Sequence, residues 1–252
     1  MLSKVKRIIA IASGKGGVGK STVTANLAMT AALAGKEVGI LDADLYGPSM
    51  GIMFGIKEEA VIYEDNTMLP AFSHGVKVAT LAQLFPAGKA NAWRGPRVAA
   101  LVKNLLDFVH WESLDLLFID MPPGTGDIQL SIIQGCNLSG AIMVSTPQAV
   151  ALADCIKGID LFKETNIPIF GLIENMSGFI CDCGKEHLIF GKSGARDFAE
   201  KSGIPFLGQV SIESSLMEGS DQGLPAVLAN PNSATAETFN QIYYKLSTHL
   251  SR

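Results

Sequence analysis

The feature that most constrains this chain is the eight-residue segment GKGGVGKS at positions 14–21. An apolar run at 7–13 precedes it and an amphipathic pattern at about 20–34 follows it, which predicts a β-strand and an α-helix joined by this loop. The spacing matches G-x-x-x-x-G-K-[ST], the pattern of loops whose backbone N–H groups and helix N-terminus hold a chain of phosphates. The alternative is a glycine-rich turn without a ligand, and the complete pattern in its strand–helix context argues against it.

The rest of the chain predicts an α/β fold, a mostly parallel sheet flanked by helices, because short apolar runs alternate with helical patterns. The predicted strands are 7–13, 38–42, 76–81, 116–120, 141–145, 169–174 and 206–208. The predicted helices are about 20–34, 96–109, 149–164, 193–201 and 234–249, and most of 45–92 is expected to be irregular. We find no repeat and no linker in the 252 residues, so we expect a single domain, 1–252, with no additional N-terminal domain.

Composition and charge argue against two classes of partner. The chain has 20 Lys and Arg against 24 Asp and Glu, a net charge of −4, so we expect no nucleic-acid partner. It has no run of 18 apolar residues and its first residues lack the pattern of a secretory signal, so we expect no membrane partner and a cytoplasmic location. The four cysteines are therefore expected to be reduced thiols.

The loop and one later strand together predict a site for a nucleotide and a metal ion. Lys20 adds charge between the terminal phosphates, and the Ser21 hydroxyl is a candidate Mg²⁺ ligand. Asp120, at the end of the strand 116–120, is expected to hold the metal through water, and Gly124 to offer its backbone N–H to a γ-phosphate. The complete set expected to contact the nucleotide is Gly14, Lys15, Gly16, Gly17, Val18, Gly19, Lys20, Ser21, Thr22, Asp120, Gly124 and Asn175.

Further candidates follow two other predicted strands. Asp42 and Asp44 point the same way from the end of 38–42, so one could orient the attacking water while the other supports Mg²⁺. The alternative is an acidic turn. Asn175 follows 169–174 at the edge of the sheet where ligands bind, and its amide could pair with the ring edge of adenine, although a residue that only forms a turn is the alternative.

Lys15 is the residue that carries a family resemblance. The segment Gly14–Thr22 resembles the deviant Walker A loop of the MinD/ParA/nitrogenase-iron-protein (SIMIBI-like) class of P-loop NTPases, and within it the chain resembles the Mrp/ApbC family of iron–sulfur cluster carrier ATPases. The other matching segments are LDADLYGPS at 41–49, WRGP at 93–96, IDMPPGTGD at 119–127, STPQ at 145–148 and ENMS at 174–177. This resemblance implies a homodimer in which Lys15 reaches the nucleotide of the partner. It also implies that Asp44 acts on the water, Asp120 on the metal and Asn175 on the base.

Two cysteines are the candidate ligands of a metal cluster. Cys181 and Cys183 form C-x-C, one residue shorter than the C-x-x-C of the family. A [4Fe-4S] cluster typically takes four thiolates, and a two-fold dimer would present four. Zinc with His187 as a further ligand, or two ordinary thiols, are the alternatives.

The sequence therefore predicts an ATPase that binds ATP, Mg²⁺ and a [4Fe-4S] cluster at a dimer interface and passes the cluster to apo iron–sulfur proteins. Lys15, Lys20 and Asp44 are its expected catalytic residues. The alternatives are a positioning ATPase of the MinD/ParA kind, which would act by binding a surface, and a metal-insertion chaperone, which would hold zinc or nickel at the cysteines.

Overall fold

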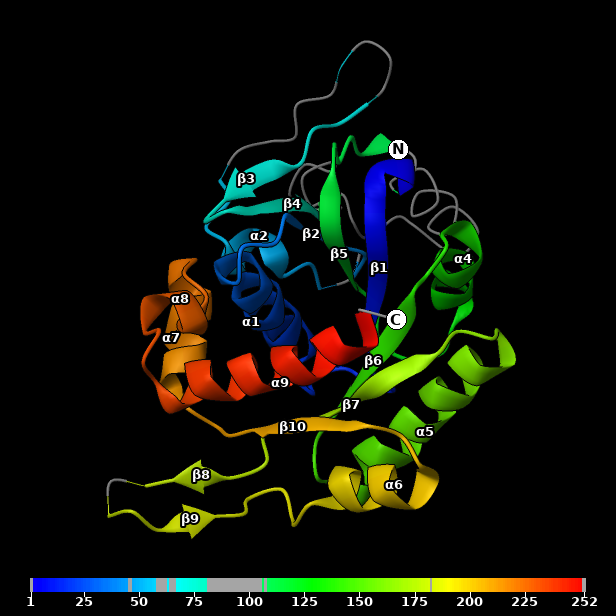
Figure 1. Cartoon of the computed structure of the whole chain (residues 1–252). Helices are drawn as coiled ribbons and strands as arrows, with labels where there is room; N and C mark the ends of the chain where they lie inside the picture. Colours follow the sequence, from blue (N-terminus) through cyan, green and yellow to red (C-terminus); the bar gives the residue numbers. More distant parts are fainter. Residues whose placement is uncertain are drawn as a thin grey trace.

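The central feature of the fold is an eight-stranded sheet with the order β10-β7-β6-β1-β5-β2-β4-β3 (Figure 1). The computed structural model describes residues 2–44, 47–57, 63, 67–80, 106, 108–181 and 183–250. All neighbouring strands of the sheet are parallel except the edge pair of β3 and β4. The strands are β1 (Val5–Ala12), β2 (Val38–Asp42), β3 (Ala71–Ser73), β4 (Val76–Thr80), β5 (Leu114–Asp120), β6 (Gly140–Ser145), β7 (Ile169–Asn175) and β10 (Phe206–Val210).

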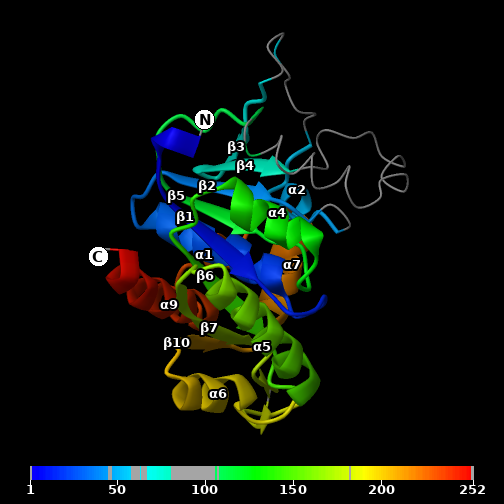
Figure 2. The same ribbon diagram turned by 90° about the vertical axis from the view of Figure 1, so that its right-hand side faces the viewer.

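Helices cover both faces of this sheet and create a hydrophobic core on each (Figure 2). The helices of one face are α1 (Lys20–Leu33), α2 (Met50–Met53), α7 (Ser214–Gln222), α8 (Ala226–Ala229) and α9 (Ala234–Leu250). Those of the other face are α4 (Asp127–Gly135), α5 (Ala149–Glu164) and α6 (Gly194–Ser202). Because both faces are buried, the central strands are nearly continuous apolar runs, as the five buried residues Ile8–Ala12 of β1 illustrate. The predicted fold class is confirmed.

The parallel arrangement brings the candidate site residues to one edge of the sheet. The carboxyl end of β1 leads into the phosphate loop, while β2, β5 and β7 end at Asp42, Asp120 and Asn175. Asp42 and Asp120 are register partners on adjacent strands. Asp42 and Asp120 are far apart in the sequence, but the sheet places them side by side.

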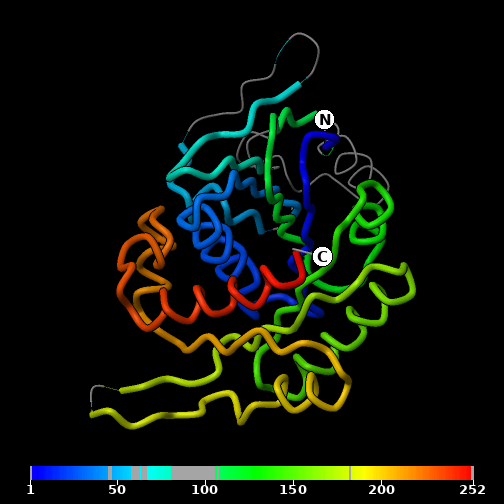
Figure 3. The backbone as a smooth tube through the Cα atoms, viewed as in Figure 1, coloured from blue at the N-terminus to red at the C-terminus, as the bar shows by residue number. Residues whose placement is uncertain are grey.

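A small hairpin carries the two neighbouring cysteines. Its strands are β8 (Phe179–Ile180) and β9 (Glu186–His187), which pair in an antiparallel manner. The hairpin projects away from the body of the molecule (Figure 3), and all four residues of its strands are exposed.

Most of the predicted elements are confirmed, with ends that differ by at most two residues. The main corrections are elements that the sequence analysis did not predict, namely the helices α2, α4, α7 and α8, the edge strand β3 and the hairpin. The predicted helix at 96–109 lies mostly outside the described residues, as does the segment WRGP at 93–96. None of the helices in the described ranges is long and apolar enough to cross a membrane.

Candidate functional site

The phosphate loop has the conformation that its glycines permit. Gly17 and Gly19 adopt left-handed backbone angles, with φ of 79° and 77°, and α1 begins at Lys20. Gly14 is required for a different reason, because a Cβ at this position would lie 2.0 Å from the backbone carbon of Asp154 in α5. The loop is therefore held between the start of α1 and the backbone of α5.

Asp120 is the centre of a buried polar cluster behind this loop. Its Oδ2 lies 2.8 Å from Lys20 Nζ and accepts a hydrogen bond of 2.6 Å from Ser21 Oγ. Its Oδ1 accepts a hydrogen bond of 2.7 Å from Thr24 Oγ1. The side chains of Lys20 and Asp120 are 6% and 0% exposed, so each charge depends on the other for compensation. The structure thus brings together three residues that the sequence analysis assigned to phosphate and Mg²⁺.

Thr24 belongs to this cluster, and the sequence analysis did not identify it. It lies one helical turn after Lys20, on the same face of α1, and its Oγ1 is also 3.0 Å from the carbonyl oxygen of Lys20. That spacing is the signal that could have found it.

Asp42 ends β2 and Asp44 follows it, and their side chains lie in different environments. The Asp42 carboxylate accepts backbone N–H groups of Asp44, Ser49 and Met50 at 2.9–3.1 Å, and so organises the chain before α2. Burial raises the pKa of Asp42, and the charge of Asp120 raises it further. Asp44 accepts the Gly47 N–H at 3.3 Å and lines the cavity at the phosphate loop.

The phosphate loop forms one wall of a cavity of about 330 Å³. Lys15, Asp44 and Pro123 contribute to its lining together with the loop backbone. Gly124, whose φ is +94°, donates its N–H to the carbonyl of Ser13 at 3.1 Å. In this structure, the N–H expected to meet a γ-phosphate is therefore bonded to the residue that precedes the loop.

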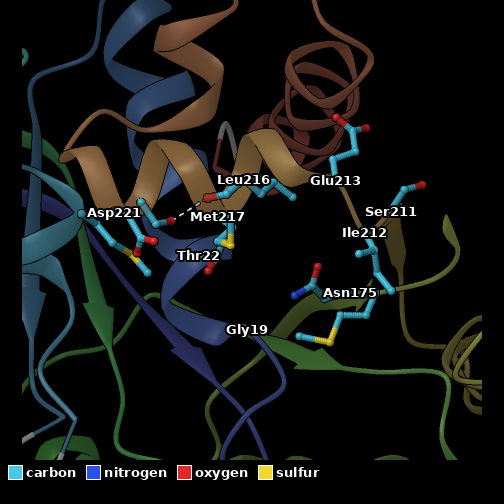
Figure 4. A pocket seen from close by; sticks show the side chains of 12 residues that line it. Gly19, Thr22, Asn175, Ser211, Ile212, Glu213, Leu216, Met217 and Asp221 are labelled. Carbon is cyan, nitrogen blue, oxygen red and sulfur yellow. Dashed lines mark hydrogen bonds between the residues drawn. The ribbon is translucent and has the colours of Figure 1, made fainter. Parts of the chain in front are cut away.

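A second pocket of about 310 Å³ adjoins this cavity and shares Gly19, Thr22 and Met53 with it. Figure 4 shows Asn175 beside Gly19 at the start of α1, with α7 on the opposite side. The remaining lining residues come mainly from the chain after β10 and from α7: Met176, Ser211, Ile212, Glu213, Leu216, Met217, Ser220 and Asp221. The lining is mostly apolar with a few polar groups, as expected of a small-molecule site. The sequence analysis identified Gly19, Thr22 and Asn175 of this lining and missed the rest, because 211–221 shows no motif.

Asn175 is 5% exposed and donates Nδ2 to the carbonyl of Val18 at 2.9 Å. A primary amide has two N–H donors and one acceptor oxygen, so this bond leaves one donor and the oxygen for another partner. A Cβ at Gly19 would lie 2.1 Å from Nδ2, which makes glycine necessary for this contact.

The sulfur atoms of Cys181 and Cys183 converge at the tip of the hairpin, 2.7 Å apart. The hydrogen bond with Cys183, followed by one with His187, lowers the pKa of Cys181 to about 7. Cys136 and Cys155 lie elsewhere, and burial raises the pKa of each to about 12. No group of three or more His, Cys, Asp or Glu side chains is arranged to hold a metal ion within the described part of one chain.

Solved structures share this fold. A nucleotide-binding protein from Archaeoglobus fulgidus in complex with ADP superposes with a TM-score of 0.78 and is 39% identical, and the match covers 89% of each chain. The cell division ATPase MinD from Pyrococcus furiosus gives a TM-score of 0.74 at 24% identity over 96% of this chain and 99% of that one. The likeness to MinD shows the fold alone.

Curated proteins of similar sequence identify the family more specifically than the solved structures do. An iron-sulfur protein required for NADH dehydrogenase, from Arabidopsis thaliana mitochondria, is 46% identical over 96% of this chain and 78% of its own length. An iron-sulfur cluster carrier protein from Escherichia coli is 43% identical over 99% of this chain and 68% of its own length. The family model of the ParA group described as the NUBPL iron-transfer P-loop NTPase matches residues 4–247. The chain therefore belongs to the ParA/NUBPL family of iron-transfer P-loop NTPases.

Proposed function

We propose that this chain hydrolyses MgATP and, as a homodimer, carries a [4Fe-4S] cluster to apo-proteins. The observation that carries the proposal is the combination, in one chain, of a phosphate site around Lys20 and Asp120 with two converging thiols on an exposed hairpin. The names of the relatives, which refer to iron–sulfur carriage, and the ADP complex of the Archaeoglobus protein support both halves of the proposal.

The nucleotide half rests on the donor chemistry of the two adjoining pockets. Ser21 and Asp120 would hold Mg²⁺ with oxygen atoms, the kind of ligand that this ion prefers. Lys20 then exchanges its contact with Asp120 for the β- and γ-phosphates. The base enters the second pocket, where the remaining N–H and the oxygen of Asn175 match the acceptor and donor of an adenine edge.

Hydrolysis adds roles for three further residues. Asp44 lines the phosphate cavity, which supports its role in orienting the attacking water. Lys15 lies at the same cavity and contributes positive charge to the transition state across the dimer interface. Gly124 gives up its bond to Ser13 when its N–H turns to the γ-phosphate, so the loop after β5 reports the state of the nucleotide.

The cluster half rests on the number of ligands. One chain offers two converging thiols on an exposed hairpin, and a [4Fe-4S] cluster takes four. A two-fold axis beside the hairpin completes the set. The lowered pKa of Cys181 favours the thiolate form that ligates iron.

Anaerobic reconstitution with iron and sulfide tests the cluster half. We expect the wild type to take up about four iron and four sulfide per dimer, and the double variant Cys181→Ala/Cys183→Ala to take up almost none. The double variant Cys136→Ala/Cys155→Ala is the matched control and should load like the wild type. Equal loading of both double variants would contradict the proposal, and zinc in the protein purified without oxygen would favour the metal-insertion alternative.

The nucleotide half is tested by Lys20→Ala. This change removes the charge that contacts the terminal phosphates, and we expect ATP hydrolysis to fall to background. Surface Lys157→Ala is the control, because Lys157 pairs only with neighbouring Asp154 in the described structure. Full turnover by Lys20→Ala would exclude this phosphate site as the site of hydrolysis.

A further inference from the structure

The last two residues of β7 connect the phosphate loop with the cysteine hairpin. Successive side chains of a strand point to opposite faces, so Glu174 and Asn175 contact different layers of the molecule. Asn175 holds the phosphate loop through the carbonyl of Val18. Glu174 holds the start of α6, the helix that follows the hairpin along the chain.

Glu174 is a buried carboxylate with two donors. Its side chain is 0% exposed, Oε2 accepts the backbone N–H of Ala195 at 2.8 Å, and Oε1 accepts Gln209 Nε2 at 2.6 Å. Within the described residues it has no basic partner, so these bonds and the N-terminal dipole of α6 compensate its charge. Such a group has a fixed position, because losing either donor leaves one oxygen of a buried carboxylate without a hydrogen bond.

The return segment of the hairpin depends on this carboxylate. The described side chain of Ser193, the N-cap residue of α6, makes no capping hydrogen bond, and its φ of 40° is left-handed. Glu174 therefore supplies from β7 the cap that the local sequence does not supply. It fixes the point at which the hairpin rejoins the body.

The segment that leads from β7 into the hairpin is hydrogen-bonded to the chain beside the second pocket. The Ile212 N–H donates to the carbonyl of Gly178 at 2.7 Å, and the Ser177 N–H donates to the carbonyl of Val210 at 3.0 Å. Ile212 and Asn175 line the same pocket, as Figure 4 shows. Both ends of the hairpin are thus bonded to residues that lie in or next to the nucleotide site.

We propose that Glu174 is a positioning residue that transmits nucleotide binding to the cysteine hairpin within each subunit. A base that engages Asn175 shifts the end of β7, and Glu174 passes this shift to the start of α6 and hence to the hairpin. The inference rests on the proposed function, because it requires nucleotide in the pocket and thiols that act at the hairpin. The proposed path lies inside one chain and is separate from the contacts between the two chains of the homodimer.

The test measures the alkylation rate of Cys181 and Cys183 in the reduced, cluster-free protein, with and without saturating Mg²⁺ and a non-hydrolysable ATP analogue. We expect the analogue to change the wild-type rate by about fivefold or more. In Glu174→Ala this ratio falls to about one, while the KM for ATP stays within about twofold because Glu174 does not line the pocket. Light scattering checks that the variant and the wild type have the same mass in the presence of the analogue. If dimer formation alone protected the thiols, the ratio in Glu174→Ala would then equal the wild-type ratio.

Glu174→Gln is the conservative control. Its amide oxygen can keep the Ala195 N–H, and its amide nitrogen can donate to Gln209 once the Gln209 amide turns over. We therefore expect Glu174→Gln to keep most of the wild-type ratio. Should Glu174→Ala fail to fold, Gln209→Ala removes only one of the two bonds and is expected to give an intermediate ratio.

A wild-type ratio of one, or a Glu174→Ala ratio equal to that of the wild type, would overturn the inference. For the fallback variant, a Gln209→Ala ratio equal to the wild-type ratio would do the same. ATP turnover and iron–sulfide content, measured on the same wild-type preparation, separate this failure from failure of the proposed function. If the wild type hydrolyses ATP and binds iron, but the nucleotide does not change the alkylation rate of its thiols, only the inference is wrong.

Discussion

At the scale of single residues, the electrostatics of the site are concentrated on Asp120. The two carboxylate oxygens of the buried Asp120 pair with one lysine and accept hydrogen bonds from two hydroxyls. A buried carboxylate stays ionised only if its charge is matched and its oxygens are hydrogen-bonded. Every donor to Asp120 therefore contributes to stability as well as to the placement of the Mg²⁺ ligands.

Thr24→Val tests this dependence. Valine keeps the shape of threonine but leaves Oδ1 of Asp120 without its 2.7 Å donor, so we expect the free energy of unfolding to fall by about 1–3 kcal/mol. Urea unfolding measures the loss. Thr24→Ser retains the hydroxyl and is expected to lose clearly less. If both variants unfold at the same urea concentration, the bond to Asp120 is not the cause.

Cys181 is expected to react with iodoacetamide at a lower pH than the buried Cys136 and Cys155. The pKa of Cys181 is lowered to about 7, and the thiolate fraction rises as the pH passes the pKa, so its alkylation rate should be half-maximal near pH 7. Burial raises the pKa of Cys136 and Cys155 to about 12, so both should stay unmodified up to pH 9 in the folded protein. Mass spectrometry of the modified peptides measures all four rates.

His187→Ala is the control for this prediction. It removes one of the hydrogen bonds that favour the Cys181 thiolate, so the midpoint of alkylation should move to higher pH. A Cys181 midpoint at or above pH 8.5 in the wild type would contradict the assigned hydrogen bonds.

At the scale of elements, the sequence predicted those helices and strands whose apolar residues form a run or recur at a regular spacing. The strands β2 and β7 and the helices α1 and α5 lie where the patterns placed them, because each has a continuous apolar run or stripe. The sequence contains a signal for the helix α4, namely Asp127 in the first turn and the apolar Ile132 and Ile133, which are buried. This helix was missed because the motif that directly precedes it was interpreted only as a loop. The strands of the hairpin have two residues each, too few for any period to appear.

The candidate site was predictable to a similar extent. The motif located Lys20 and Ser21, and a strand end located Asp120, because these depend on local spacing. The caps made by Asp42 and Glu174 join residues far apart in sequence, and no pattern in one sequence reports such contacts.

The contact between the phosphate loop and α5 leads to an element-scale prediction. Gly14→Ala places a Cβ 2.0 Å from the backbone of Asp154, so α5 or the phosphate loop must shift. We expect the free energy of unfolding to fall by about 1–3 kcal/mol or more, measured by urea unfolding. Gly16→Ala is the matched control, since the nearest atom to its Cβ is 4.0 Å away, and its stability should be unchanged. Equal stability of the two variants would show that α5 does not press on the loop.

At the scale of the whole molecule, one chain holds half of each proposed assembly. It supplies two thiols where a [4Fe-4S] cluster takes four. Its Lys15 lines the phosphate cavity but, in the proposed mechanism, serves the nucleotide of the partner. A homodimer completes both sites at once, since a two-fold axis doubles every group.

A mixing experiment distinguishes a lysine that acts across the dimer from one that acts within its own chain. Lys15→Ala and Lys20→Ala should each hydrolyse ATP at background rates, because one lacks the charge donated to the partner and the other lacks the charge at its own phosphates. In an equal mixture, half of the dimers are mixed, and each has one complete site. In that site, Lys20 of the Lys15→Ala chain is joined by Lys15 from the Lys20→Ala chain. The mixture should therefore recover about a quarter of wild-type turnover. Background turnover in the mixture, with exchange of subunits verified by mass, would mean that Lys15 acts on the nucleotide of its own chain.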